Sequence, residues 1–256
     1  MTYTREQIVQ LLLQGRPISI VRYGDGESIM LNSTSSFSAF RKASIDVLRR
    51  QIGCDPTLKE VEDIRQNLID TYANADIIGV PMHKNLASLS KSWTEAANIL
   101  KENVPTHTEN ICNIDVAYQM LDTDDYDKLL RNRHVLNYIS CRDLDEGFKR
   151  RFNVGIVNKF TIAPEMKFTS GYEGLKHYPD QFNRIPRWME VQAENFPGSL
   201  LLVGAGVIGK IYCNWWRDLG GVAFDAGGCM DIWAGFITRG PERGLDKVDP
   251  DPKYKL

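Results

Sequence analysis

An apolar run passes directly into a glycine-rich turn at Ser199-Leu200-Leu201-Leu202-Val203-Gly204-Ala205-Gly206-Val207-Ile208-Gly209, a strand followed by G-x-G-x-x-G. The residues after the turn predict a helix over 210–219 and a second strand over 221–224, which ends in Asp225. A strand, turn, helix and strand with an acidic residue about twenty positions after the first glycine form the context in which this motif binds nucleotides. The sequence therefore predicts an α/β crossover of the nucleotide-binding kind.

Each glycine of the turn has an expected task. Gly204 would permit the tight turn, Gly206 would let main-chain N–H groups face a diphosphate, and Gly209 would let the helix pack on the strand. Asp225 could accept hydrogen bonds from ribose hydroxyls. The alternative is a βα unit that only packs and binds no ligand.

The place of this unit in the chain bears on the class of protein. Asp225 lies near the C-terminal end of the 256 residues, so the unit closes a sheet built from earlier strands and does not open a dinucleotide domain. The length fits one α/β domain over residues 1–256. Residues 226–235 form a further glycine-bearing turn, and its carboxylate, Asp231, is a candidate for the same cleft.

A second motif, Arg22-Tyr23-Gly24-Asp25-Gly26-Glu27, follows the apolar run at residues 17–21. Asp25 and Glu27 are two positions apart, so on a continuing extended backbone both carboxylates would point to the same side. Such a pair suits Mg²⁺ or Mn²⁺ held jointly with substrate phosphates, because these ions keep waters and take only one or two protein carboxylates.

The other residues of this motif support a phosphate site. Arg22 offers a fixed positive fork for phosphate, and Gly24 lets the main chain bend and a ligand approach. The alternative is that Asp25-Gly26 forms an ordinary tight turn, since Asp-Gly is among the commonest turn dipeptides.

Two further strand ends carry candidate residues. The strand predicted over residues 133–140 ends in Ser140-Cys141-Arg142-Asp143, which offers phosphate a hydroxyl and a guanidinium ahead of a helix at 144–152. Alternatively, Ser140 caps that helix and Arg142 pairs with Asp143 or Asp145. His83 and Lys84, after the strand predicted over residues 76–80, are second-tier candidates.

A long loop predicted over residues 168–187 is the remaining feature with a possible functional role, because loops of this length in compact domains are usually functional. Its aromatic side chains could stack on sugar or base faces, or could only hold the loop in place: Tyr172, His177, Tyr178 and Phe182.

Composition excludes several classes of protein. The formal net charge is −2 and the basic residues are scattered, which argues against duplex nucleic acid as a partner. No apolar run approaches a membrane span, and the N-terminus lacks a signal pattern, so we expect a cytoplasmic protein. The five cysteines are far apart, odd in number and without a Cys-x-x-Cys pair, which indicates reduced thiols: Cys54, Cys112, Cys141, Cys213 and Cys229.

Together the two motifs resemble the bacterial GT-D glycosyltransferases. Residues 22–27 resemble the Asp-x-Glu motif of that family, and residues 204–212, 225–227 and 231–235 match its glycine-rich C-terminal part. The middle of the chain matches only loosely. The resemblance implies a Rossmann-like, mostly parallel sheet with helices on both faces in a single GT-D-type domain.

The resemblance also implies an activity. It is transfer of a sugar from a nucleotide diphosphate donor, typically a UDP-sugar, to a glycan or glycoprotein acceptor in surface glycan synthesis, with Asp25 and Glu27 holding Mn²⁺ or Mg²⁺. The sequence leaves the sugar, the acceptor and the oligomeric state open. The candidate catalytic residues are Asp25, Glu27 and Asp231, and the candidates for holding the donor are Arg22, Gly24, Arg142, Gly204, Gly206, Gly209 and Asp225.

Two other functions compete with this one. A nicotinamide- or S-adenosylmethionine-dependent enzyme would use Gly204 to Gly209 and Asp225 but would leave Asp25 and Glu27 without a task. A non-catalytic nucleotide-sugar binding module would use both motifs but would transfer nothing. Binding of UDP, NAD or S-adenosylmethionine separates the first of these from a glycosyltransferase, and release of UDP in the presence of an acceptor separates the second.

Overall fold

Seven parallel strands form one sheet in the order β3-β2-β1-β7-β6-β4-β5. The computed structural model describes residues 1–32, 38–52, 55–82, 87–165, 174–236 and 255–256, without the side chains of 38–41 and 87–94. The strands are β1 (Ile18–Arg22), β2 (Ile77–Val80), β3 (Ile111–Asn113), β4 (Val135–Ser140), β5 (Ile156–Thr161), β6 (Leu200–Gly204) and β7 (Val222–Asp225). The prediction of a Rossmann-like parallel sheet is confirmed.

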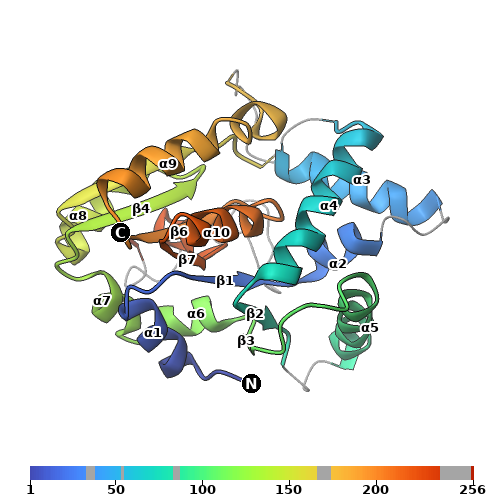
Figure 1. The fold of residues 1–256 in the computed structure, drawn as a ribbon, viewed down its shortest axis with the longest axis horizontal. Coiled ribbons are helices and arrows are strands. Elements are labelled where there is room, and N and C mark those ends of the chain that lie inside the picture. The colour runs from blue at the N-terminus through green and yellow to red at the C-terminus, as the bar shows by residue number, and fades with distance from the viewer. Residues whose placement is uncertain (33–37, 53–54, 83–86, 166–173, 237–254) are drawn as a thin grey trace.

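Helices cover both faces of the sheet (Figure 1). Strand β6 shows why, because its alternate side chains enter two separate apolar layers: Leu201 and Val203 enter one, and Leu200 and Leu202 the other. The first layer is covered by α2 (Asp25–Leu31), α3 (Ser38–Ile52), α4 (Leu58–Asn74), α5 (Ala87–Asn103), α9 (Ile185–Asn195) and α10 (Gly209–Asp218). The second is covered by α1 (Arg5–Leu13), α6 (Val116–Leu121), α7 (Asp125–Leu130), α8 (Asp145–Phe152) and α11 (Cys229–Trp233).

Several predicted elements differ from the observed ones. Residues 116–130 form two short helices, α6 and α7, and the Thr123 hydroxyl between them donates to Asp125 at 2.7 Å. In its described part, the loop expected over 168–187 contains a short helical turn at His177–Gln181, which extended backbone at Tyr178 interrupts, and the start of α9. Strand β3 and helix α9 were not predicted, and the flexible turn expected over 226–235 contains the short helix α11.

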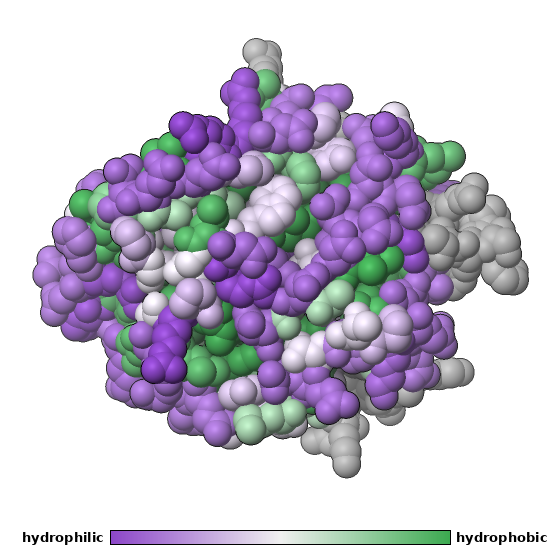
Figure 2. Space-filling model, viewed as in Figure 1, coloured by the Kyte–Doolittle hydropathy of each residue, from purple (hydrophilic) through white to green (hydrophobic). Residues whose placement is uncertain are grey.

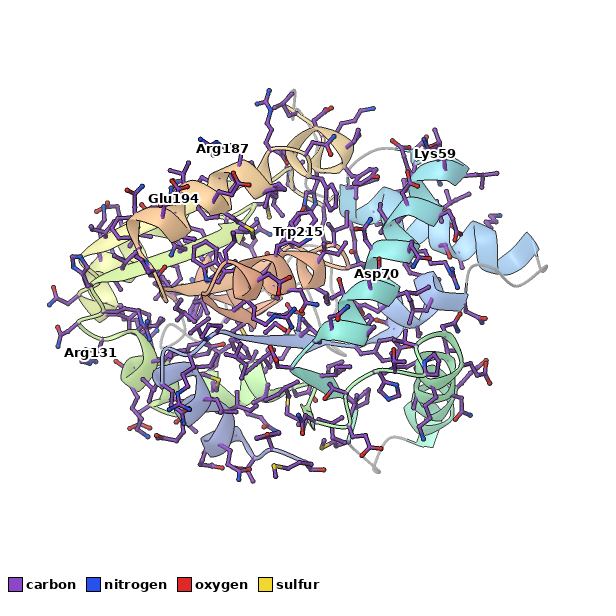
Figure 3. All side chains as sticks on the ribbon, viewed as in Figure 1. Lys59, Asp70, Arg131, Arg187, Glu194 and Trp215 are labelled. Atoms are coloured by element: carbon purple, nitrogen blue, oxygen red, sulfur yellow. The ribbon has the colours of Figure 1, made fainter. Side chains whose placement is uncertain are left out.

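The face of the molecule shown in Figure 2 has the polar helix surfaces that are usual in a folded domain. Hydrophilic side chains cover much of the face shown in Figure 2, with smaller hydrophobic areas between them. On the outer sides of α4 and α9 lie Lys59, Asp70, Arg187 and Glu194 (Figure 3). Among the described residues, no helix combines the length and the apolar character needed to cross a bilayer.

Candidate functional site

The carboxyl ends of four neighbouring strands bring the predicted site residues to one edge of the sheet. Strands β1, β7, β6 and β4 are adjacent and parallel, and they end at Arg22, Asp225, Gly204 and Ser140. In open parallel sheets this edge is where ligands bind. Motifs at opposite ends of the sequence therefore meet in one place.

The backbone at Asp25 differs from the expectation. Instead of continuing as an extended chain or closing a hairpin turn, it begins helix α2 at Asp25, with Gly24 as the N-cap. Side chains two positions apart on a helix do not face each other, so Asp25 and Glu27 point to different surroundings. Asp25 is exposed and accepts from the N–H of Gly26 at 2.9 Å, whereas Glu27 is buried.

Both oxygens of Glu27 are bound within the protein. Oε1 lies 2.7 Å from Nζ of Lys210, and Oε2 accepts from the N–H of Gly24 at 3.0 Å. The second contact is half of a capping box, in which an acidic residue in the first helical turn reaches back to the N-cap. Glu27 is therefore part of the packing between α2 and α10.

Four charged side chains form a cluster below this edge. Nζ of Lys210 lies 3.2 Å from Oδ2 of Asp225, and Nε of Arg22 lies 3.3 Å from the same oxygen. With Glu27, the cluster holds two positive and two negative groups, so each charge has a partner of opposite sign. Lys210 and Asp225 are 3% and 1% exposed, and unpaired charges at that depth would be strongly destabilising.

The cluster sets the protonation of its own members. Burial alone would lower the pKa of Lys210, but the carboxylates of Asp225 and Glu27 outweigh it and raise that pKa. Burial would raise the pKa of Asp225, but Arg22 and Lys210 outweigh it and hold that pKa below its ordinary value. Lys210 and Asp225 therefore remain charged at neutral pH. The predicted contact between Asp225 and a ribose stays a prediction. In this structure the partners of Asp225 are the side chains of Arg22 and Lys210.

The left-handed residue of the glycine turn is Gly206, whereas Gly204 was expected to permit the tight turn. Gly206 has φ +60°, so it carries the left-handed conformation of the turn. A Cβ on Gly204 would lie 2.5 Å from Cγ of Met230, so this glycine makes room for α11 and is not where the chain needs a left-handed residue. A Cβ on Gly209 would lie 2.9 Å from Val203, which confirms the predicted close packing of helix on strand.

Gln51 of α3 reaches into the turn. Its Oε1 accepts from the N–H of Val207 at 2.5 Å, and a Cβ on Gly206 would lie 2.4 Å from the same oxygen. A Cβ on Gly26 would lie 3.2 Å from Val207 and 3.7 Å from Gln51. The N-terminal motif and the glycine turn thus lie close together, and the amide oxygen of Gln51 occupies one main-chain N–H of the turn.

Two neighbouring hollows open at this edge and share Cys141 in their walls. The smaller, of about 30 Å³, lies over the glycine turn and includes Glu165 and Asp231. The larger, of about 410 Å³, includes Arg142 and Phe236. An ion pair joins their walls, because Nε of Arg142 donates to Oδ1 of Asp231 at 2.7 Å.

The partner of Arg142 at the end of β4 differs from those that the sequence predicted. The partner expected for Arg142 was a phosphate, or else Asp143 or Asp145, and the structure pairs it with Asp231. Asp145 instead accepts from the hydroxyl of Tyr138 at 2.7 Å. The Ser140 hydroxyl accepts from the N–H of Arg142 at 3.1 Å, so Ser140 shapes the turn before the helix and does not act as its N-cap.

The described aromatic residues of the predicted loop pack against the protein. The ring of His177 is buried, with Nε2 2.8 Å from the hydroxyl of Tyr212, and burial lowers the pKa of His177 to about 4. Tyr178 packs on Phe182, which packs on Trp215 of α10. These aromatics hold the segment in place. His83, Lys84 and Tyr172 lie outside the described residues.

Sequence reasoning missed two residues of this site. Lys210 follows the third glycine of the turn, and the residues on either side of it in α10 are buried. A lysine among buried residues is almost always paired, so its position indicates a buried acidic partner. Gln51 gives no comparable signal, because a glutamine near the end of a long helix is ordinary. In the described ranges, no group of three or more His, Cys, Asp or Glu side chains could hold a metal ion.

The parallel sheet, the glycine turn opening α10 and the charged groups at the strand ends define an α/β protein of the Rossmann-like class. The chain belongs to the family of GT-D fold-like domains, whose model matches residues 2–233. This family and fold support a glycosyltransferase.

Solved structures agree on the fold. A selenomethionine structure of domain of unknown function 1792 is similar with a TM-score of 0.62 and 13% identity, covering 99% of this chain and 92% of that one. A second, described as having a distinct glycosyltransferase fold, gives 0.60 and 12% over the same shares. A third, described as a new glycosyltransferase from Streptococcus sanguinis, gives 0.58 and 13%, covering 91% and 83%. No curated protein matches the sequence.

Proposed function

We propose that this protein transfers a sugar from a nucleotide diphosphate donor, expected to be a UDP-sugar, to a glycan or glycoprotein acceptor. The observation that carries the proposal is the contact between the two motifs, where Gly26 lies against Val207 and Gln51 at the carboxyl edge of the sheet. One ligand could therefore touch both motifs at once. Two of the similar structures are described in terms of a glycosyltransferase, which agrees with this proposal.

The glycine turn is the proposed diphosphate site. The N–H of Val207 already binds an oxygen acceptor there, and it lies at the start of α10, where the helix dipole favours negative charge. Arg22 and Asp225 act below the turn as a bound pair, which fixes the end of β7 against the end of β1.

A divalent cation, Mn²⁺ or Mg²⁺, is part of the proposal. Asp25 fits the role of a ligand because its carboxylate is exposed and the next residue, Gly26, lies close to Val207 of the turn. One carboxylate with phosphates and water is a usual set of ligands for these ions. Glu27 does not fit it, because both of its oxygens are bound to Lys210 and Gly24. When bound, the cation would offset negative charge on the departing nucleotide.

Asp231 is the carboxylate that we propose to act beside the reacting sugar. It lines the smaller hollow, next to the turn, and Arg142 in the wall of the larger hollow holds it in one orientation. An oriented carboxylate between two neighbouring hollows can accept a hydrogen bond or a proton from a sugar hydroxyl.

UDP with Mn²⁺ is expected to raise the melting temperature more than UDP alone. A ligand at about 100 times its Kd stabilises the native state by about 2.7 kcal/mol, which for a chain of this size is roughly 5–10 °C. Thermal melts with UDP, Mn²⁺ and both measure the effect. Equal shifts with and without Mn²⁺ would remove the cation from the proposal.

The same melts distinguish the competing functions. NAD or S-adenosylmethionine in place of UDP should give no shift, and a shift by either would favour a different Rossmann-like enzyme. Release of UDP from a UDP-sugar, measured with and without surface-glycan extracts, separates a transferase from a module that only binds the donor.

Gln51→Glu is expected to weaken UDP binding by about tenfold, because the new carboxylate would hold the N–H of Val207 and repel a diphosphate. Gln51→Ala is the control, since it removes the amide oxygen without adding charge, and it should bind UDP at least as well as the unchanged protein. Calorimetric titration gives both affinities. Equal affinities in the two variants would mean that the diphosphate does not bind at Val207.

A further inference from the structure

The carboxylate of Glu27 is buried and bound within the protein. Its side chain is 9% exposed, Oε1 lies 2.7 Å from Nζ of Lys210, and Oε2 accepts from Gly24. A divalent cation on Oε1 would lie close to the ammonium group of Lys210, and two positive charges at such a distance repel each other. Asp25, two positions earlier, has an exposed carboxylate.

Lys210 binds both Glu27 and the glycine turn. Its Nζ donates to the carbonyl of Gly206 at 2.7 Å, and it lies 3.2 Å from Oδ2 of Asp225. A single ammonium group thus ties α2, the glycine turn and the end of β7 together. The carbonyl it binds belongs to the residue with φ +60°, so the contact holds the residue that gives the turn its shape.

We propose that Glu27 is a positioning residue and not a ligand of the cation: it fixes Lys210, and Lys210 fixes the main chain at Gly206. Of the two carboxylates in the motif, only that of Asp25 is exposed and could reach a ligand. The identity of that ligand rests on the proposed function, but the contacts among Glu27, Lys210 and Gly206 do not.

This role differs from plain helix capping. A cap acts within α2, so its loss would affect α2 and overall stability only. A positioning role also predicts a change at the glycine turn, which precedes another helix, α10, and is far away in sequence. Amide hydrogen exchange of residues 204–209 measures that change without any ligand.

The test compares Glu27→Gln with Asp25→Asn and with Ile8→Ala, a buried change in α1 that lowers stability elsewhere. The first measurement is hydrogen exchange of the amides at 204–209, at denaturant concentrations that give all variants the same global free energy of unfolding. The second is the Mn²⁺ factor, the ratio of UDP affinity with Mn²⁺ to UDP affinity without it. In Glu27→Gln we expect exchange at the turn at least about tenfold faster than in Ile8→Ala, and a Mn²⁺ factor within about threefold of that of the unchanged protein. In Asp25→Asn the Mn²⁺ factor should fall close to one.

Two results would overturn the proposal. Loss of the Mn²⁺ factor in folded Glu27→Gln would make Glu27 a ligand, and exchange at the turn equal to that of Ile8→Ala would leave it a cap only. If Glu27→Gln folds poorly, E27Q/K210M supplies the factor by which Mn²⁺ raises UDP affinity, because it removes both members of the pair and leaves no lone charge. Failure of the unchanged protein to bind UDP would refute the proposed function, and the exchange measurement would still decide the role of Glu27.

Discussion

Asp25→Asn is expected to lower sugar transfer by at least about 100-fold while the melting temperature stays within about 2 °C of that of the unchanged protein. The carboxylate is exposed at the first residue of α2, so its removal opens no cavity and leaves no buried partner. Within the part of the chain that the structure describes, the carboxylate accepts from the N–H of the next residue, and an asparagine side chain can accept the same hydrogen bond. The change therefore removes a charge from the proposed cation site and little else.

Glu6→Gln is the matched control for this experiment. Glu6 also lies in the first turn of a helix, α1, and is exposed, so its replacement removes the same charge from a helix N-terminus away from the site. Such a charge contributes about 0.3–1 kcal/mol to stability. Release of UDP from the donor and thermal melts are measured on the same preparations. Transfer by Asp25→Asn at the level of Glu6→Gln would take Asp25 out of the mechanism.

Local patterns predicted the glycine unit well. Apolar alternation and the glycine spacing define β6, the turn and α10, because each depends on residues that are neighbours in sequence. A capping box at Thr4 and Gln7 begins α1 through the same kind of local contact. Where a structure is set by contacts within one element and its turn, the sequence was sufficient.

The N-terminal motif shows where local patterns fail. Asp25-Gly26 suits a turn, an extended site or a helix start, and nothing within residues 22–27 selects among them. The choice depends on Lys210, whose ammonium group neutralises Glu27 once that carboxylate is buried. A partner so far away in the sequence leaves no periodic signal, and the contact of Gln51 with Val207, 156 positions apart, is hidden for the same reason.

The charge cluster explains why the turn after β7 contains a glycine. Asp225 ends that strand and holds the guanidinium of Arg22, so the chain that follows must pass directly over the guanidinium. A Cβ on Gly227 would lie 1.6 Å from Nη2 of Arg22. Gly227 is thus required by the ion pair beside it as well as by its φ of +51°.

Gly227→Ala is therefore expected to lower the free energy of unfolding by about 4 kcal/mol or more, and sugar transfer with it. Left-handed backbone alone costs alanine about 1–2 kcal/mol, and breaking the buried pair of Arg22 with Asp225 adds about 3–5 kcal/mol. Gly15→Ala is the control, because Gly15 has φ +67° and its added Cβ would meet no atom within 4 Å. Urea unfolding of both variants isolates the effect of the clash, which should exceed about 2 kcal/mol. Equal losses in the two variants would show that Arg22 can move aside without cost, and that the charge cluster does not hold this edge of the sheet.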